Sequence, residues 1–114
     1  MAADRWSKEL PIAITVCDTE GIIIEMNDRS IETFIKDGGA ALMGSNVLDC
    51  HPEPSRTQLR NMLEHATPNI YTIEKNGKKK LICQAPWKQN GVYSGFVELS
   101  IDLPDQLSHF VRDP

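Results

Sequence analysis

The sequence predicts an α+β fold, in which a five-stranded antiparallel sheet carries helices packed on one face. Two short alternating apolar runs stand near the start of the chain and three more near its end, as expected for strands. Helical patterns fill the segment between these groups, and Asn-Gly turns at 76–77 and 90–91 mark hairpins in the second group. This order predicts one sheet that is covered by the helices between its two halves.

The length of the chain, 114 residues, is that of one domain, and we expect residues 1–114 to share a single core. Hydrophobic residues make up 40% and charged residues 25%, as in an ordinary soluble globular protein. No apolar run approaches the roughly 20 residues that a membrane helix needs, and the first residues do not resemble a signal peptide. No membrane partner is expected.

Charge and cysteine content disfavour two further classes. The net charge of −4 opposes a phosphate backbone, and the basic cluster of Lys75 and Lys78–Lys80 spans a hairpin turn, so no nucleic-acid partner is expected. Cys17, Cys50 and Cys83 are far apart and never form a C-x-x-C pair. This usage indicates a reducing compartment, with the cytoplasm as the expected location, and opposes a thiolate zinc site.

The first part of the chain predicts a short helix and then a hairpin. Four apolar residues lie near helical spacing within residues 1–11: Ala2, Ala3, Trp6 and Leu10. Such a short amphipathic helix, or cap, needs a partner surface. Residues 12–17 and 22–26 then alternate as two strands around a tight turn at 18–21.

Two helices and some single turns are predicted next. Asn27 can cap a helix that ends at the glycines 38–39, and its apolar stripe is Ile31, Phe34 and Ile35. Residues 40–48 predict single helical turns separated by Gly44. Ser55 and Gln58 form a capping box, so a second helix starts at Ser55 and ends before Pro68. Its buried stripe comprises Leu59, Met62, Leu63 and Ala66.

Three strands and a closing helix complete the chain. Residues 69–75, 80–87 and 92–102 have strand patterns, and Pro104 suits a first helical turn. The stripe of this closing helix is Leu103, Leu107, Phe110 and Val111. The predicted core comprises Ile14, Val16, Ile24, Ile31, Phe34, Leu59, Leu63, Ile73, Leu81, Phe96 and Leu99.

Three motifs, in order and at matching spacing, resemble those of a PAS domain. They are ITVCDTEGIIIEMN at 14–27, LMGSNVLD at 42–49 and SID at 100–102, the last similar to the D-I-T motif of that family. The resemblance implies a PAS core at residues 12–103, followed at 104–114 by the start of a signalling helix. Arg29, where the family often has a small residue, and Pro104, in place of the threonine of D-I-T, depart from the pattern.

The segment Cys50-His51-Pro52 resembles a group of bacterial PAS modules with C-H-P ahead of helix F, some of them attached to hemerythrin-like domains. Flavin photochemistry is disfavoured, because the light-sensing PAS subgroup has a cysteine directly after the asparagine that Asn46 matches, and Val47 stands there. Covalent haem would need C-x-x-C-H, which is absent here. The cofactor is therefore unknown, and haem is a candidate that the sequence does not favour.

The candidate ligand-contacting residues are Cys50, His51, Met43, Asn46 and Trp87, and a ligand would lie between the sheet and residues 43–55. A neutral His51 could ligate haem iron or hydrogen-bond a small carboxylate, and Arg56 is the nearest group that could favour a Cys50 thiolate. The alternative is structural, with the thiol filling a gap and the imidazole bonding the backbone. No metal site and no catalytic residues are predicted.

The function that the resemblance implies is a sensory signal-transduction module, not an enzyme, that binds a small ligand, dimerises, or does both. Its output domain, a kinase, diguanylate cyclase or transcription regulator, would lie outside this chain unless the module is free-standing. One alternative is a ligand-free dimerisation adaptor, and another is a haem- or cofactor-binding redox or gas sensor. A homodimer is expected through Trp6, Leu10, Leu107 and Phe110.

Overall fold

The computed structural model describes residues 5–114 as five strands, two α-helices and three one-turn 3-10 helices. In chain order these elements are β1 (Ala13–Cys17), β2 (Ile23–Met26), α1 (Asp28–Thr33), η2 (Ile35–Asp37), η3 (Gly39–Leu42), η4 (Val47–Cys50), α2 (Ser55–His65), β3 (Asn69–Lys75), β4 (Lys78–Gln89) and β5 (Val92–Asp102). All five strands join one sheet in the order β2-β1-β5-β4-β3, and every neighbouring pair is antiparallel.

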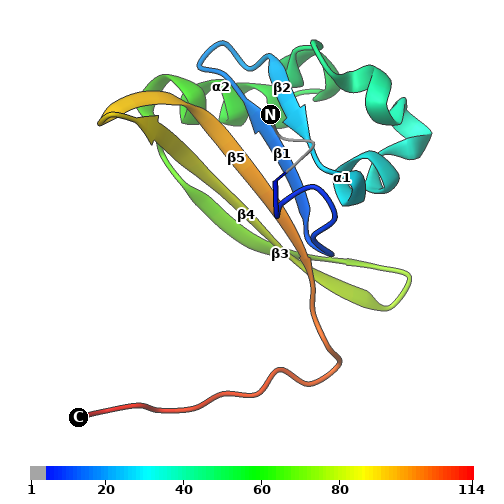
Figure 1. Cartoon of the computed structure of the whole chain (residues 1–114), viewed down its shortest axis with the longest axis vertical. Coiled ribbons are helices and arrows are strands. Elements are labelled where there is room, and N and C mark those ends of the chain that lie inside the picture. Colours follow the sequence, from blue (N-terminus) through cyan, green and yellow to red (C-terminus); the bar gives the residue numbers. More distant parts are fainter. Residues whose placement is uncertain (1–4) are drawn as a thin grey trace.

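The helices lie on one side of this sheet, so the predicted α+β architecture is confirmed (Figure 1). The strands β3 and β5 have the predicted bounds, and β4 is longer by two residues at each end. Asn76 and Asn90 have positive φ angles of 55° and 52°, each followed by a glycine that is also left-handed. This is the backbone of the two-residue turns that Asn-Gly favours.

The centre of the core lies where α2 packs on the sheet. Met62 and Leu63 of α2 are buried against Cys17 of β1 and Phe96 of β5. Tyr93 packs edge-on against Phe96, with ring centroids 6.1 Å apart, and its hydroxyl donates to the carbonyl oxygen of Leu63 at 2.8 Å. The apolar stripe that the sequence predicts for this helix is therefore the buried face.

The prediction that Ile24 and Ile73 belong to the core is wrong. These two side chains are 45% and 41% exposed. They lie on β2 and β3, which are the two edge strands of the sheet, so neither residue is enclosed by strands on both sides. The other predicted core positions are buried or half-buried: Ile14, Val16, Ile31, Phe34, Leu59, Leu63, Leu81, Phe96 and Leu99.

The start of α2 differs from the predicted capping box. Pro54 is the N-cap and Ser55 is already helical, so the serine hydroxyl makes no capping bond. Instead the carboxylate of Glu53 accepts from the backbone N–H of Thr57 at 2.9 Å and from its hydroxyl at 2.7 Å. The hydrogen bond from the Thr57 hydroxyl is the main cause of a lowered pKa of Glu53.

Neither terminal helix is found in the described chain. Residues 5–10 form turns and residues 103–114 are irregular, while Ala2 and Ala3 lie outside the described residues. The C-terminal segment extends away from the sheet (Figure 1). A short amphipathic pattern forms a stable helix only when its apolar face packs against something, and Trp6 and Phe110 are 79% and 69% exposed.

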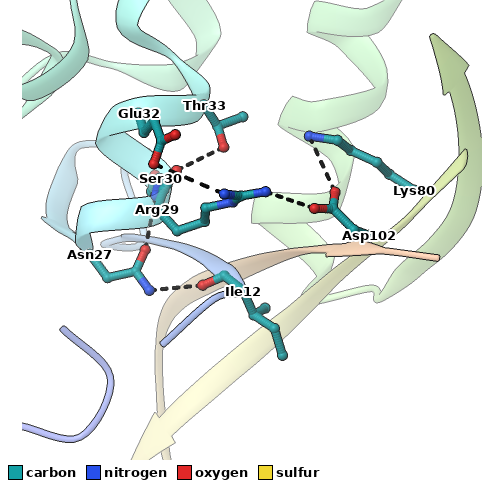
Figure 2. Close-up of polar contacts among 8 residues, drawn as sticks. All are labelled: Ile12, Asn27, Arg29, Ser30, Glu32, Thr33, Lys80 and Asp102. Atoms are coloured by element: carbon teal, nitrogen blue, oxygen red, sulfur yellow. Dashed lines mark hydrogen bonds and ion pairs between the residues drawn. The ribbon is translucent and has the colours of Figure 1, made fainter. Parts of the chain in front are cut away.

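The helix α1 is shorter than predicted, since Ile35 falls in η2 and is 63% exposed. Its predicted cap is confirmed. The Asn27 side-chain oxygen accepts from the N–H of Ser30 at 3.0 Å and from that of Ile14 at 2.9 Å. The Asn27 amide donates to the carbonyl oxygens of Ile12 at 2.8 Å and Ser7 at 2.9 Å. One buried side chain thus joins α1, β1 and the N-terminal segment. Figure 2 shows its bonds to Ser30 and Ile12.

We expect Asn27→Ala to lower the free energy of unfolding by about 2 kcal/mol, because it leaves buried backbone groups without partners and removes a helix cap. Urea denaturation followed by circular dichroism measures this. The matched control is Asn61→Ala, an exposed position on α2, with an expected change within about 0.5 kcal/mol. Equal midpoints for the two variants would contradict the role given to Asn27.

Arg29, which departs from the family pattern, connects α1 to the end of β5 through an ion pair. Arg29 pairs with Asp102 at 2.7 Å and lies 4.0 Å from Glu32, and Lys80 reaches Asp102 at 3.7 Å (Figure 2). Asp102 belongs to the SID motif that resembles D-I-T. These side chains are partly exposed, so each pair contributes less than about 1 kcal/mol to stability.

Candidate functional site

A cavity of about 500 Å³ lies between the sheet and the segment that runs from α1 to α2. Most of its lining is apolar, which is typical of small-molecule sites. The apolar lining residues are Cys17, Ile23, Met26, Phe34, Leu42, Val47, Leu59, Met62, Phe96 and Val97. The remaining lining residues are Thr15, Asp37, Cys50, His51, Gln84 and Glu98.

The irregular wall of the cavity is held in place by hydrogen bonds to the first hairpin. The N–H of Gly44 donates to Ile23, and the N–H of Ile23 donates to Ser45, at 2.8 and 2.9 Å. The N–H of Val47 donates to the carbonyl oxygen of Gly21 at 2.9 Å. Gly21 has a φ of +88°, and a Cβ there would lie 3.0 Å from the Asn46 side chain. A glycine is thus required where the wall meets the hairpin.

His51 lies in the cavity lining with a fixed ring. Its Nδ1 is 2.6 Å from the carbonyl oxygen of Val47. A carbonyl only accepts, so Nδ1 carries the proton and Nε2 of the neutral ring is left as an acceptor. The Arg56 Nε donates to the carbonyl oxygens of Leu48 and His51, each at 3.0 Å, and so fixes the backbone on both sides of Cys50.

Cys50 also lines the cavity, but its environment differs from that of Cys17. Cys17 is 6% exposed and burial is the main cause that raises the pKa of its thiol. Cys50 is exposed, with its Sγ 4.0 Å from the carbonyl oxygen of Asn46. The guanidinium of Arg56, which the sequence offered as a partner for Cys50, is engaged by carbonyl oxygens.

We expect iodoacetamide at pH 8 to modify Cys50 well before Cys17 in the folded protein. Exposure favours Cys50, and the raised pKa of Cys17 leaves less of the reactive thiolate. Peptide mapping by mass spectrometry at successive times measures both rates. In denaturant the two rates should converge, and equal rates in the folded state would contradict the buried position of Cys17.

The opposite wall of the cavity is the sheet, which places a row of polar side chains there. Glu98 of β5 lies opposite Thr15 of β1 and opposite Gln84 of β4. The Gln84 amide donates to the Glu98 carboxylate at 2.7 Å, and the Asn69 amide donates to the Gln84 oxygen at 3.4 Å. Thr15 and Ser30 share a hydrogen bond of 2.5 Å between their hydroxyls.

The other three predicted ligand contacts are not in the lining. Met43 is 44% exposed. The Asn46 side chain accepts from the N–H of Leu48 and donates to the carbonyl oxygen of Glu20, so it builds the wall. The Trp87 indole N–H donates to the carbonyl oxygen of Cys17 at 3.1 Å. Whether Cys50 and His51 bind a ligand stays a prediction.

The residues predicted for a dimer interface lie on the surface. Trp6, Leu107 and Phe110 are 79%, 69% and 69% exposed, and Leu10 is half-buried. Within residues 5–114 the apolar side chains of Trp6, Leu107 and Phe110 are therefore largely uncovered. In the same part of the chain, no three His, Cys, Asp or Glu residues gather as a metal site would require. None of the described helices has the length and apolar character to cross a membrane.

The polar lining residues that sequence reasoning missed are Thr15, Asp37, Gln84 and Glu98. One signal was available for Glu98, because it follows Phe96 by two residues and so shares its face of the strand. A charged residue at an inward position is unusual, since burying a charge is costly unless it is paired. The partner, Gln84, is set by strand register and has no such local signal.

Comparisons with known proteins agree with this fold. A family model described as PAS fold matches residues 7–74. Among solved structures, the chain is similar to the Aer2 receptor of Vibrio cholerae, described as a dual PAS-heme oxygen sensor. The TM-score is 0.65 at 17% identity, covering 82% of this chain and 95% of that one.

Two further solved structures are similar to this chain to a comparable degree. A sensory box sensor histidine kinase from Vibrio cholerae gives a TM-score of 0.64 at 18% identity, covering 86% of each chain. The PAS domain of BvgS from Bordetella pertussis gives 0.62 at 18% identity, covering 88% of this chain and 82% of that one. At these identities the likeness concerns the fold. No curated protein matches the sequence.

Proposed function

The chain belongs to the PAS-fold family, and we propose from this that it is the sensory input module of a bacterial signalling protein, with the cavity as its ligand site. One observation carries the proposal: an apolar cavity of about 500 Å³ whose polar groups gather at His51 on one wall and at Glu98 on the other. An apolar cavity with few, fixed polar groups is suited to binding a small molecule.

A path from the cavity to the end of the sheet supports a signalling role. Phe34, which lines the cavity, directly follows α1, and Asp37, a second lining residue, ends the next turn, η2. Arg29 of α1 pairs with Asp102 at the end of β5. A ligand that displaces Phe34 and Asp37 would shift α1. The ion pair between Arg29 and Asp102 would transmit this shift to the segment after Leu103. An output domain beyond that segment, a cytoplasmic location and a non-enzymatic role belong to this proposal.

Haem, which the Aer2 description names, fits the lining poorly. His51 is the only histidine there, and its Nε2 could face an iron. The two propionates of haem, however, need cationic or donor partners. Among residues 5–114, the lining has carboxylates at Asp37 and Glu98 and no lysine or arginine. Haem is therefore not part of the proposed function.

Native mass spectrometry of freshly purified protein, with an absorption spectrum, tests the proposal. We expect a bound small molecule on a fraction of the chains and no Soret band. His51→Ala should reduce the bound fraction. His65→Ala is a matched control, because His65 Nδ1 likewise bonds the carbonyl oxygen four residues earlier, at 2.9 Å, but lies outside the cavity. An equal fraction of ligand-bound chains in the two variants would show that His51 does not contact the ligand.

A second candidate function is a ligand-free dimerisation adaptor, favoured by the exposed apolar side chains of Trp6, Leu107 and Phe110. We propose a homodimer through these residues, since exposed large apolar side chains can gather at an interface between two copies of a chain. Light scattering should report twice the chain mass, and Trp6→Ala with Phe110→Ala should give monomers. A parent protein that stays monomeric at millimolar concentration would exclude this interface.

A further inference from the structure

We propose that the cavity selects ligands with a flat apolar body and a cationic amine, and that Glu98 is the residue that recognises the amine. This inference rests on the proposed function, because it takes the cavity to be a ligand site. It concerns the charge and hydrogen-bonding character of the ligand. Neither the family nor the fold specifies these properties.

The polar row on the sheet presents Glu98 as an acceptor. Gln84 donates to one oxygen of the carboxylate, Oε2, at 2.7 Å. The Asn69 amide donates to the side-chain oxygen of Gln84, Oε1, at 3.4 Å, which orients the Gln84 amide with its NH₂ group toward Glu98. Within residues 5–114, Gln84 is the only hydrogen-bond partner of the Glu98 side chain. The second oxygen, Oε1, therefore remains for a donor that a ligand or water supplies.

The opposite wall also offers an acceptor. His51 donates through Nδ1 to Val47, so the neutral ring presents the lone pair of Nε2. The described chain gives this nitrogen no partner of its own. Apart from the second amide hydrogen of Gln84 and the Thr15 hydroxyl, which Ser30 already engages, the lining drawn from residues 5–114 offers mainly acceptors at Glu98 and His51, and a ligand that brings N–H donors satisfies them. A ligand with only acceptors would leave these groups unpaired, which is costly in a partly buried site.

The charge of the lining also favours a cationic ligand. Asp37 and Glu98 are its carboxylates, and no lysine or arginine of the described chain belongs to it. Arg56, the arginine nearest in sequence to Cys50 and His51, donates through Nε to the carbonyl oxygens of Leu48 and His51. A carboxylate or phosphate ligand would face like charge without a counter-ion, whereas an ammonium group gains a charge-assisted hydrogen bond.

The rest of the lining determines the body of the ligand. Phe34 and Phe96 supply aromatic rings, and Met26 and Met62 supply flexible thioethers. Methionine adapts to irregular apolar shapes and makes favourable contacts with aromatic rings. A planar aromatic body therefore suits these walls, with its amine directed to the sheet at Glu98.

Three probes with one indole ring test the charge preference by calorimetry at low ionic strength. Tryptamine carries a cationic amine, tryptophol a neutral hydroxyl and indole-3-acetate a carboxylate. We expect tryptamine to bind about tenfold more tightly than tryptophol, since a charged hydrogen bond is about twice as strong as a neutral one. Indole-3-acetate should bind weakest of the three.

Glu98→Gln removes the charge and keeps the shape, and it should abolish the advantage of tryptamine over tryptophol. Glu64→Gln is the matched control. It makes the same change of charge at an exposed position of α2 outside the lining, and it should keep the preference. Circular dichroism checks the fold of both variants. The comparison of probes on the parent protein needs no variant.

The outcomes separate this inference from the proposed function. If tryptophol binds but tryptamine is no tighter, or if the preference survives Glu98→Gln, the ligand class is wrong and the cavity remains a ligand site. If none of the three probes binds, the inference and the cavity site both fail. The predicted order of affinities, lost in Glu98→Gln and kept in Glu64→Gln, supports the inference.

Discussion

Gly95→Ala is expected to destabilise the protein by about 4 kcal/mol or to prevent folding. Gly95 lies in β5 with a φ of +140°, where alanine is strained by about 1–3 kcal/mol. A Cβ there would meet the backbone of the neighbouring strand end, 2.8 Å from the Asp18 Cα and closer still to the Cys17 carbonyl oxygen. Overpacking of this kind costs a further 1–3 kcal/mol or so.

The same carbonyl oxygen accepts the hydrogen bond of the Trp87 indole, and Trp87 lies opposite Gly95 in the sheet. The glycine thus leaves room for β1 and for this indole to meet. Gly77→Ala is the matched control, because Gly77 has a φ of +76° with nothing within 4 Å of a Cβ. It should lose only about 1 kcal/mol. Equal urea midpoints for the two variants would show that the close approach is absent.

Leu63→Ala is expected to lower the free energy of unfolding by about 2–5 kcal/mol. Leu63 is 6% exposed and packs in the cluster that joins α2 to the sheet. The hydrogen bond from the Tyr93 hydroxyl goes to the Leu63 backbone, so the substitution keeps it. The measured loss therefore reports the side chain alone, as lost apolar burial and a residual cavity.

Ile35→Ala provides the comparison for Leu63. Ile35 is 63% exposed in η2, outside the proposed dimer interface and the cavity lining, and its truncation should change stability by less than about 0.5 kcal/mol. Thermal unfolding of both variants at one protein concentration measures the difference. A melting temperature of Leu63→Ala equal to that of the parent would mean that another face of α2 is buried.

The sequence predicted most of the sheet because its signals are local. Alternation and Asn-Gly turns define β3 and β5 without reference to the rest of the chain, and both strands have the predicted bounds. The cap at Asn27 is equally local, since its oxygen and the Ser30 N–H are three residues apart. The capping box at Ser55 was wrong because Glu53, two residues earlier, takes that role.

The terminal helices were wrong for a different reason. An amphipathic stripe such as Trp6 with Leu10, or Leu107 with Phe110, indicates that a face would be buried if a partner surface were present. Short helices are marginal without such a surface. Within the described chain Trp6, Leu107 and Phe110 find no covering element and stay exposed.

The candidate site was predicted on one wall only. Cys50 and His51 were found because prolines hold an unusual pair of side chains ahead of α2, and both line the cavity. Glu98 and Gln84 were missed because their meeting depends on strand register across 14 residues of sequence. Long-range pairing of this kind leaves no pattern in a single sequence.

The most direct test of the cavity as a ligand site uses methionine methyl signals in an NMR titration with tryptophol, a neutral probe. Met26 and Met62 line the cavity, whereas Met43 lies outside it and is 44% exposed. We expect the methyl resonances of Met26 and Met62 to shift and saturate together while that of Met43 stays in place. Unchanged Met26 and Met62 signals at saturating probe, or a shift confined to Met43, would contradict a ligand site between the sheet and the helices.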